Sequence, residues 1–499
     1  MRSTFTKSVS WSISLPLLVT AVVAGSACAP SSSTPPPGSG GTVGTGGVIG
    51  SGGTIGSGGV VGAGGSVGVG GTVGVGGTVG VGGTVGTGGG TATGGGTASG
   101  GGGNVVGGEW GKVENPSAAC TVGALPSRDS LMTDPKLPDP FTKMDGTPMT
   151  DRSEWLCRRQ EILEETHAFI YGKKPVPEEG SVSGSVSSSS ITVSAEGPEG
   201  TAMFTVSVNM NGATGPAPAI IGYGGVNPIP VPSGIAILNF TPVETSGGSG
   251  PKSGPFYDAY GSDHEAGILI AQAWQVSRLI DVLEQNPGTI DPYHLGVTGC
   301  SRNGKGAFVA GVLDNRIALT MPIESGIGGT VAMRLVHGLD SGANTEYPYH
   351  TISYVRWMSE IALGQFTTSN DESGDQTDDL PVDMHELMAV IAPRGLFIMD
   401  NPSTTYNGLD RNSAWVTANV GKMAFEALGV GDHLTYAGAS GSHCAEWRTP
   451  YVAPFAAMVD KFLKGNDAAS TGTVTTDLSN PPDPLDHIDW TAPTLTGEL

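Results

Sequence analysis

The sequence has few basic residues, and this shortage excludes several classes of protein. Its 24 lysines and arginines stand against 46 aspartates and glutamates, for a net charge of −22. Such a charge opposes binding to nucleic acid or to an anionic membrane surface. The sequence also lacks HExxH, CxxC and any other cluster with metal-ligand spacing, and no GxGxxG motif with an acidic partner occurs. We therefore expect a protein with an acidic surface, without a metal, cofactor or nucleic-acid partner.

Residues 1–29 have the pattern of an export signal. Arg2 and Lys7 precede an apolar run that is shorter than an ordinary membrane span. A small-small-Cys pattern ending at Cys28 predicts a lipoprotein, whereas the Ala-x-Ala pattern around the same cysteine predicts ordinary secretion. The lipoprotein is favoured because the other four cysteines then form two pairs. We expect an exported, monomeric protein that meets a membrane only through lipid on Cys28.

Glycine crowds into residues 30–108, where a six-residue repeat (GGVIGS, GGTIGS, GGVVGA and onward) runs from Gly46 to about Gly88. Ordering a chain with glycine at half its positions is entropically costly, and the repeat has no bulky residues to fill a core. We interpret this stretch as a flexible spacer, although the valine-rich repeats could instead associate with one another. The remaining residues, 109–499, are sufficient for one large domain.

Hydrophobic patterns in this domain predict mixed α/β structure. A helix is expected over 152–171, and the runs 181–193 and 202–210 alternate as antiparallel edge strands do. Strands and helices then follow one another, with strands at 219–223, 234–240, 294–298, 317–323, 395–399 and 433–438 and helices at 267–283, 305–313 and 452–463. This order predicts a mostly parallel, doubly wound sheet. The tail from about 465 is expected to wrap the surface, held by Trp490.

The segment LGVTGCSRNGKGAF places Ser301 between a predicted strand and a predicted helix. Small residues at such a turn let the backbone bend tightly and expose a nucleophilic serine. The second glycine of a G-x-S-x-G motif comes one place late, at Gly304, with Asn303 in its usual position. Asn tolerates unusual backbone angles better than most residues. The alternative is an ordinary turn in which the serine only caps the helix.

A serine nucleophile needs a base and an acid that orients the base. His443 follows the last predicted strand, where an α/β-hydrolase carries its histidine. Two acids qualify for the third role, because Glu324 and Asp400 end the two strands that follow the nucleophile helix. Either carboxylate could also simply face solvent.

Cysteine positions support the same arrangement. Cys300 precedes the candidate nucleophile and Cys444 follows the candidate base, so a disulfide between them would bring the two loops together. Cys120 and Cys157 would then pair in the N-terminal section. The alternative is two unrelated buried thiols.

Two cations follow the serine. The backbone N–H and guanidinium of Arg302 are candidates for stabilising an oxyanion, and Lys305 for binding substrate hydroxyls. Cations at a helix N-terminus oppose the helix dipole, which favours a functional role over simple solvation. His264 and His385 are expected to be structural, with a supporting role near the site as the alternative for His264.

Together these segments resemble the glucuronoyl esterases, carbohydrate esterase family 15, from about Cys120 to Lys464. The likeness lies in GVTGCSRNGKGAF, RIALTMPIESGIGG, FYDAYGSDHEAG, WQVSRLIDVLEQ, VIAPRGLFIMDN and GSHC. It implies an α/β-hydrolase fold, a three-layer sandwich around a mostly parallel sheet. It also implies that the chain hydrolyses the ester between 4-O-methyl-glucuronic acid of glucuronoxylan and lignin alcohols.

Carried over by position, the resemblance gives Ser301 as nucleophile, His443 as base, Glu324 as acid and Arg302 as oxyanion contributor. Asp400 stands where some members have an alternative acid, and both cysteine pairs match family disulfides. Three sugar-binding positions differ: Glu346 replaces the glutamine of fungal members, Tyr354 replaces a glutamate, and Tyr406 is nearest to an expected tryptophan. Lys305 is implied to bind sugar hydroxyls.

Two other functions remain open at this point. One is a serine esterase of the same fold that acts on another glycan or aromatic ester. The other is a non-catalytic surface module that binds polysaccharide.

Overall fold

The computed structural model describes residues 111–244, 251–340, 345–349, 351, 356–362, 376–403 and 409–499. All of them belong to the second of two units, Gly96–Leu499. The predicted export signal with Cys28, the glycine-rich repeat, Tyr354 and Tyr406 lie outside the described residues. Within this described part, none of the helices combines the length and apolarity that crossing a bilayer requires.

The described strands form one ten-stranded sheet in the order β1-β2-β3-β5-β4-β6-β7-β8-β9-β10. Pairing is antiparallel from β1 to β5 and parallel from β5 through β4 to β10, which confirms the mostly parallel sheet with an antiparallel edge. The strands are β1 (Val182–Val186), β2 (Ser190–Glu196), β3 (Thr201–Asn209), β4 (Ala217–Tyr223), β5 (Ala236–Phe240), β6 (Ile290–Cys300), β7 (Ile317–Ile323), β8 (Gly395–Asp400), β9 (Leu434–Gly438) and β10 (Val474–Thr476).

The predicted single strand over 181–193 was wrong, because this segment makes a hairpin. β1 pairs with β2 with Val186 opposite Ile191, and the chain turns between them. The backbone N–H of Ser187 donates to the Ser190 carbonyl, and the Ser187 hydroxyl accepts from the Ser190 N–H. Serine hydroxyls that bond to nearby backbone groups favour turns over strands, so the serine run marks the bend.

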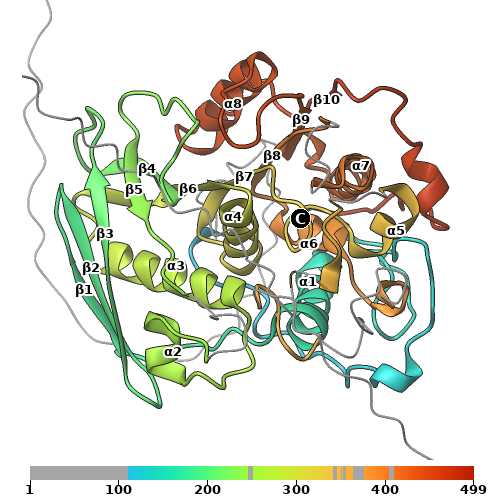
Figure 1. Cartoon of the computed structure of the whole chain (residues 1–499), viewed down its shortest axis with the longest axis horizontal. Helices are drawn as coiled ribbons and strands as arrows, with labels where there is room; N and C mark the ends of the chain where they lie inside the picture. Colours follow the sequence, from blue (N-terminus) through green and yellow to red (C-terminus); the bar gives the residue numbers. More distant parts are fainter. Residues whose placement is uncertain are drawn as a thin grey trace, which may run out of the picture. The chain divides into compact units, whose positions relative to one another are not determined.

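Helices cover both faces of the sheet, which confirms the three-layer arrangement (Figure 1). Side chains of β8 show the division: Leu396 and Ile398 join the larger core, while Phe397 and Met399 join a separate core. The larger core includes α1 (Trp155–Thr166), α3 (Ile268–Gln285), α4 (Arg302–Leu313), α6 (Met384–Ile391) and α7 (Arg411–Ala427). The separate core lies under α8 (Thr449–Phe462). Two further helices are short, α2 (Pro255–Tyr260) and α5 (Val336–Leu339).

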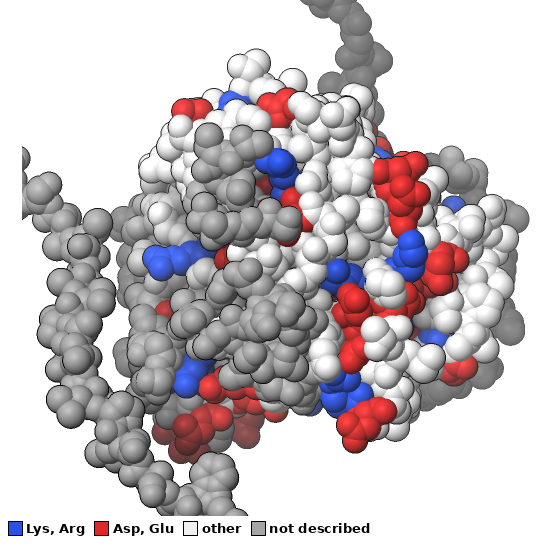
Figure 2. Space-filling view, turned by 45° about the vertical axis from the view of Figure 1, so that its right-hand side comes forward, with Lys and Arg blue, Asp and Glu red and all other residues white. Residues whose placement is uncertain are grey.

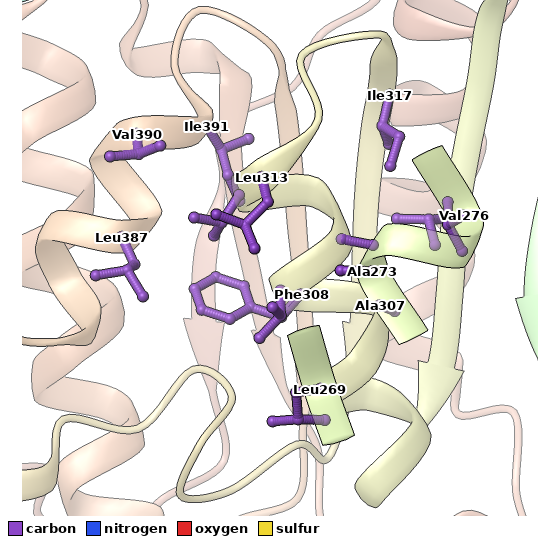
Figure 3. Packing of buried hydrophobic residues seen from close by; sticks show 14 of the residues in the cluster. Leu269, Ala273, Val276, Ala307, Phe308, Leu313, Ile317, Leu387, Val390 and Ile391 are labelled. Carbon is purple, nitrogen blue, oxygen red and sulfur yellow. The ribbon is translucent and has the colours of Figure 1, made fainter. Parts of the chain in front are cut away.

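Helix α4, which follows the candidate nucleophile, is held between two other helices. Figure 3 shows Ala307 of α4 facing Ala273 of α3, and Phe308 of α4 lying toward α6 and its Leu387. All four side chains are completely buried. Burying apolar surface on both sides fixes the helix, and with it the turn at its N-terminus.

The C-terminal tail of the described domain packs against its N-terminal section. The disulfide Cys120–Cys157, with α-carbons 5.3 Å apart, confirms the predicted pairing and ties the first segment to α1. The tail adds β10 beside β9, and the Trp490 indole N–H donates to the carbonyl of Leu137 at 2.8 Å. Thr496 exchanges backbone hydrogen bonds with residues 150 and 152. The tail therefore closes over the N-terminal section, as the sequence predicted for Trp490.

Acidic and basic side chains are mixed on the face drawn in Figure 2, where red and blue groups lie next to one another. Ion pairs also lie below the surface, where the buried Arg316 pairs with Asp281, Glu284 and Asp314. Arg316 reduces the repulsion among these carboxylates, while the net charge of the chain stays at −22.

Candidate active site

The candidate nucleophile lies on a sharp turn between β6 and α4. Ser301 has φ 59° and ψ −128°, a left-handed backbone that side-chain-bearing residues rarely adopt. Its N–H donates to the carbonyl of Ile323 on β7 at 2.9 Å. A Cβ on the neighbouring Gly299 would lie 2.4 Å from the Asn303 carbonyl, so only glycine fits there. This is the strained strand-turn-helix geometry that presents a serine hydroxyl in α/β-hydrolases.

The late second glycine of the motif has a structural reason. A Cβ on Gly304 would lie 2.6 Å from the Ile323 carbonyl, so glycine at this position lets α4 approach β7. Asn303 occupies the usual glycine position, and its amide lies against Gly224, which follows β4 with φ +68°. In this turn, the glycine that allows the close contact between helix and strand is therefore Gly304, one residue later than in the G-x-S-x-G motif.

Glu324 is the acid that contacts the histidine. It follows β7 directly and is 2% exposed. Its Oε2 lies 2.5 Å from Nδ1 of His443, which is in the loop after β9. The same oxygen accepts the backbone N–H of Cys444 at 3.2 Å. A hydrogen bond at Nδ1 fixes the imidazole tautomer and leaves Nε2 as the basic nitrogen.

A cation that the sequence did not draw attention to lies on the other side of Glu324. Nη2 of Arg448 is 2.7 Å from Glu324 Oε1, and both side chains are buried. Burial raises the pKa of Glu324, but the hydrogen bond from His443 and the charge of Arg448 outweigh burial, so the pKa lies below its usual value. The carboxylate is thus kept ionised. Arg448 comes five positions after His443, and no motif marks such an arginine.

The alternative acid, Asp400, is placed differently. It ends β8, is 3% exposed, and its Oδ1 accepts the backbone N–H of Asn401 at 2.9 Å. Burial raises the pKa of Asp400 to about 7, against the opposing effect of that hydrogen bond. Its backbone carbonyl accepts the Tyr451 hydroxyl at 2.6 Å. The carboxylate that is hydrogen-bonded to Nδ1 of His443 is therefore that of Glu324 and not that of Asp400.

The disulfide Cys300–Cys444 joins the two loops of the site. Its α-carbons are 5.8 Å apart and its cysteines are 144 residues apart in sequence, which confirms the predicted pairing. Sγ of Cys444 lies 3.6 Å from Nε2 of His443, so the basic nitrogen is beside the bridge that adjoins Ser301. The two sulfurs and a Glu324 oxygen cluster within 4.8 Å of one another. Both sulfurs are in a covalent S–S bond, and a metal would need thiolates.

Lys305 and Glu346, predicted as separate sugar-binding residues, form an ion pair. Nζ of Lys305 lies 2.6 Å from Glu346 Oε2 and also donates to the carbonyls of Ser325 and Ile327, each at 2.6 Å. Its three donors are thereby occupied. Lys305 is 2% exposed, whereas the Glu346 side chain is 20% exposed, so Glu346 is the more accessible member. Arg302, the first residue of α4, is exposed.

Asp410 lies near this pair and was not found from the sequence. It is 1% exposed, and among the described residues neither carboxyl oxygen makes a hydrogen bond of standard geometry. Burial, together with the charges of Asp340 and Glu346, raises its pKa to about 9. An aspartate just before a helix is typical of an N-cap, but the Asp410 side chain does not cap α7.

The two other histidines singled out in the sequence are structural. Nδ1 of His264 accepts the backbone N–H of Ala266, and its ring packs edge-on against Phe256. His385 is completely buried with Nε2 2.8 Å from the Pro138 carbonyl, and burial lowers its pKa to about 4. His385 therefore packs in the core, as expected, and also makes a hydrogen bond with the backbone of Pro138.

Comparison with known proteins gives consistent results. The family model for fungal glucuronyl esterase matches residues 191–429. A 4-O-methyl-glucuronoyl methylesterase of Hypocrea jecorina is 38% identical over 389 residues, which cover 76% of this chain and 80% of that protein. One from Neurospora crassa is 40% identical, with 62% and 77% covered.

Solved structures agree. The glucuronoyl esterase catalytic domain of Hypocrea jecorina matches with a TM-score of 0.66 at 38% identity, over 74% of this chain and 100% of that one. A serine-to-alanine variant of the Sporotrichum thermophile enzyme, in complex with methyl 4-O-methyl-β-D-glucopyranuronate, matches with a TM-score of 0.68 at 34% identity, over 76% and 100%. The chain therefore belongs to the glucuronoyl esterase family, carbohydrate esterase family 15, and is a carboxylic ester hydrolase.

Proposed function

We propose that this enzyme hydrolyses the ester between 4-O-methyl-glucuronic acid of glucuronoxylan and lignin alcohols, with Ser301, His443 and Glu324 as its triad. The observation that carries the proposal is the Glu324–His443 contact of 2.5 Å, held beside the Ser301 turn by a disulfide. Support for the substrate comes from relatives named 4-O-methyl-glucuronoyl methylesterase and from the relative bound to a methyl glucuronate ester.

The chemistry is a two-step acyl transfer. Ser301 Oγ attacks the uronoyl carbonyl while His443 Nε2 takes its proton, and the tetrahedral intermediate expels the alcohol, which receives that proton. Water then attacks the acyl-enzyme with His443 again as base, and glucuronate leaves. The buried Glu324 carboxylate stabilises the imidazolium that forms in each step.

The developing oxyanion needs donors at the start of α4. The backbone N–H of Arg302 follows the nucleophile directly, and its exposed guanidinium adds positive charge at the same end of the helix. Donors already in place when negative charge develops contribute about 3–4 kcal/mol each to such a transition state. We assign the oxyanion role to Arg302.

Sugar recognition falls to the Lys305–Glu346 pair, with Tyr354 and Tyr406 proposed as further contacts. Because the Lys305 donors are occupied, a sugar hydroxyl reaches Lys305 only by replacing one of its partners. Glu346 is the partner that is accessible. A sugar hydroxyl can therefore be recognised in two ways. It donates a hydrogen bond to the Glu346 carboxylate, or it displaces that carboxylate and accepts a hydrogen bond from Lys305 Nζ.

This altered pair also supports a second candidate, an esterase of the same fold that acts on another glycan or aromatic ester. Rates on methyl glucuronate, benzyl glucuronate, acetylated xylan and feruloyl esters separate the two. Preference for the uronate esters is expected, and faster turnover of the acetyl or feruloyl esters would favour the second candidate.

For the location of the enzyme we propose export, with lipid on Cys28 and the glycine-rich repeat as a tether. Mass spectrometry of the mature N-terminus tests this, since diacylglyceryl at Cys28 is expected and an unmodified residue 30 would indicate ordinary secretion.

The nucleophile is tested with Ser301→Ala and benzyl glucuronate. Turnover is expected to disappear while the thermal unfolding midpoint stays close to that of the parent enzyme. A fluorophosphonate should label the parent at Ser301 and leave the variant unlabelled. Retained turnover in Ser301→Ala would refute the nucleophile assignment, and an unlabelled parent would favour a non-catalytic binding module.

A further inference from the structure

Arg448 connects three parts of the site that come from different regions of the chain. Its Nη2 lies 2.7 Å from Glu324 Oε1 and 2.8 Å from the carbonyl of Ser442, the residue before His443. Its Nη1 donates to the Tyr451 hydroxyl, which in turn donates to the Asp400 carbonyl at the end of β8. One guanidinium thereby links the acid after β7, the histidine loop and β8.

We propose that Arg448 is a positioning residue, which aligns the Glu324 carboxylate with His443 by holding both the carboxylate and the histidine loop. The proposal rests on the function proposed above, in which Glu324 is the acid of the triad. It adds a residue that touches neither the substrate nor the reacting atoms.

The hydrogen bonds of Glu324 show why the acid needs this partner. Oε2 faces His443 Nδ1 and the Cys444 N–H, whereas Oε1 is bound by Arg448. The Glu324 side chain is 1% exposed, so without the guanidinium Oε1 would be a buried, unpaired charge. The carboxylate would then gain by rotating or by taking up a proton, and either change weakens its bond to the imidazole.

The histidine loop is shaped to receive the guanidinium. A Cβ on Gly441 would lie 2.4 Å from Arg448 Nε, so glycine at this position lets the arginine pack under the loop. Arg448 is 7% exposed, and its buried Nε has no hydrogen-bond partner in the part of the chain that the structure describes. An unsatisfied buried donor costs about 1–3 kcal/mol. The buried position of Arg448 therefore depends on the contacts of Nη1 and Nη2, which have to outweigh the cost at Nε.

Charge distribution distinguishes the two acids of the site. Glu324 faces His443 and Arg448, and the groups packed around it include Asp400 and Tyr451. The cation contacts Glu324 directly, whereas the Asp400 carboxylate accepts a backbone N–H. Arg448 therefore favours ionisation of the acid that is bonded to His443.

The test compares Arg448→Met and Arg448→Lys with the parent enzyme on benzyl glucuronate. Active sites are counted by fluorophosphonate labelling, so that kcat refers to folded enzyme only. For Arg448→Met we expect kcat to fall about 10- to 100-fold with KM little changed, by analogy with other residues that orient a catalytic group. Its acid limb of kcat against pH should move to higher pH, because the cation that opposes protonation of the Glu324–His443 pair is gone.

Arg448→Lys keeps the charge but loses the planar fork. We expect kcat between the parent and the methionine variant, with the acid limb close to that of the parent. If Arg448→Met does not fold, Arg448→Lys alone tests the proposal. A kcat of Arg448→Lys equal to that of the parent would then overturn the positioning role. Lys461→Met is the control, because Lys461 is a buried cation of α8, the helix that Arg448 precedes, and pairs with Asp432 instead. Its kcat and pH profile should match the parent.

An unchanged kcat and pH profile in Arg448→Met, counted per labelled site, would also overturn the proposal. A purely structural role would lower the fraction of labelled enzyme and leave the profile per site unchanged. Failure of the proposed function is a separate result, because it would appear as activity remaining in Ser301→Ala.

Discussion

Nδ1 of His443 lies 2.5 Å from Oε2 of Glu324, which precedes it by 119 residues in the chain. In the proposed triad the acid therefore comes from the end of β7, the strand beside β6, rather than from β8. This placement has consequences for which substitutions abolish activity.

Exchanging each acid for its amide tests this placement. Glu324→Gln should reduce kcat on benzyl glucuronate by about 10³- to 10⁴-fold, since an amide cannot stabilise the imidazolium. Asp400→Asn should cost less than about tenfold, because the Asp400 carboxylate bonds a backbone N–H. A larger loss in Asp400→Asn than in Glu324→Gln would assign the acid to β8.

Removal of the two disulfides should have different effects. Replacing Cys300 and Cys444 together by alanine should lower stability by about 2–5 kcal/mol and also lower kcat, because the bridge holds the Ser301 and His443 loops together. Replacing Cys120 and Cys157 should lower stability while kcat per active site is retained. Equal kcat in the two double variants, measured after active-site labelling, would contradict this reasoning.

Gly304→Ala tests the displaced glycine. The added methyl would lie 2.6 Å from the Ile323 carbonyl, so α4 has to move away from β7 and take the nucleophile turn with it. We expect a loss of about 1–3 kcal/mol in unfolding free energy, measured by denaturant titration, and a lower kcat. Gly338→Ala is the matched control, because a methyl there meets nothing within 4 Å. Comparable effects of the two substitutions would refute the steric explanation.

Stability should depend on pH through Asp410. Its pKa is raised to about 9 in the folded protein from an ordinary value of 3.8, so folding favours the protonated acid. That contribution is complete below about pH 4 and is lost as the pH rises toward 9. The Tm of Asp410→Asn should therefore exceed that of the parent by a margin that grows between pH 5 and pH 9.

The control for this prediction is Asp145→Asn. Hydrogen bonds from Thr147 lower the pKa of Asp145, so its contribution is lost toward acid pH instead. A margin for Asp410→Asn that stays constant with pH would show that Asp410 is ionised in the folded protein.

The sequence was sufficient to locate the Ser301 turn, the His443 loop and the Cys300–Cys444 bridge, because these residues follow strongly apolar strands. The Cys120–Cys157 bridge was predicted because the other cysteines were already assigned. Arg448 could not be found this way, since its role comes from contacts with residues far away in sequence. Helix α7 was also missed: its asparagines, threonine and glycine are weak helix formers, and the helix is stabilised by burying Val416, Val420 and Phe425.

The pairing of Lys305 with Glu346 was equally invisible, because two residues 41 positions apart were each matched to a substrate contact and not to one another. The serine-rich hairpin between β1 and β2 was missed because β-branched residues recur among small residues on both sides of the turn, at Val182 and Val186 before it and at Ile191 and Val193 after it. The ion pair depends on a tertiary contact about which local pattern carries no information, whereas the serine run at 187–190 was a local signal for the turn.

The closure of the tail over the N-terminal section also bears on engineering. Because Thr496 bonds to residues 150 and 152, and Trp490 to Leu137, trimming the tail would remove contacts that hold the N-terminal section. An insertion or fusion is better placed in the exposed serine turn after Val186, which contains none of the proposed site residues.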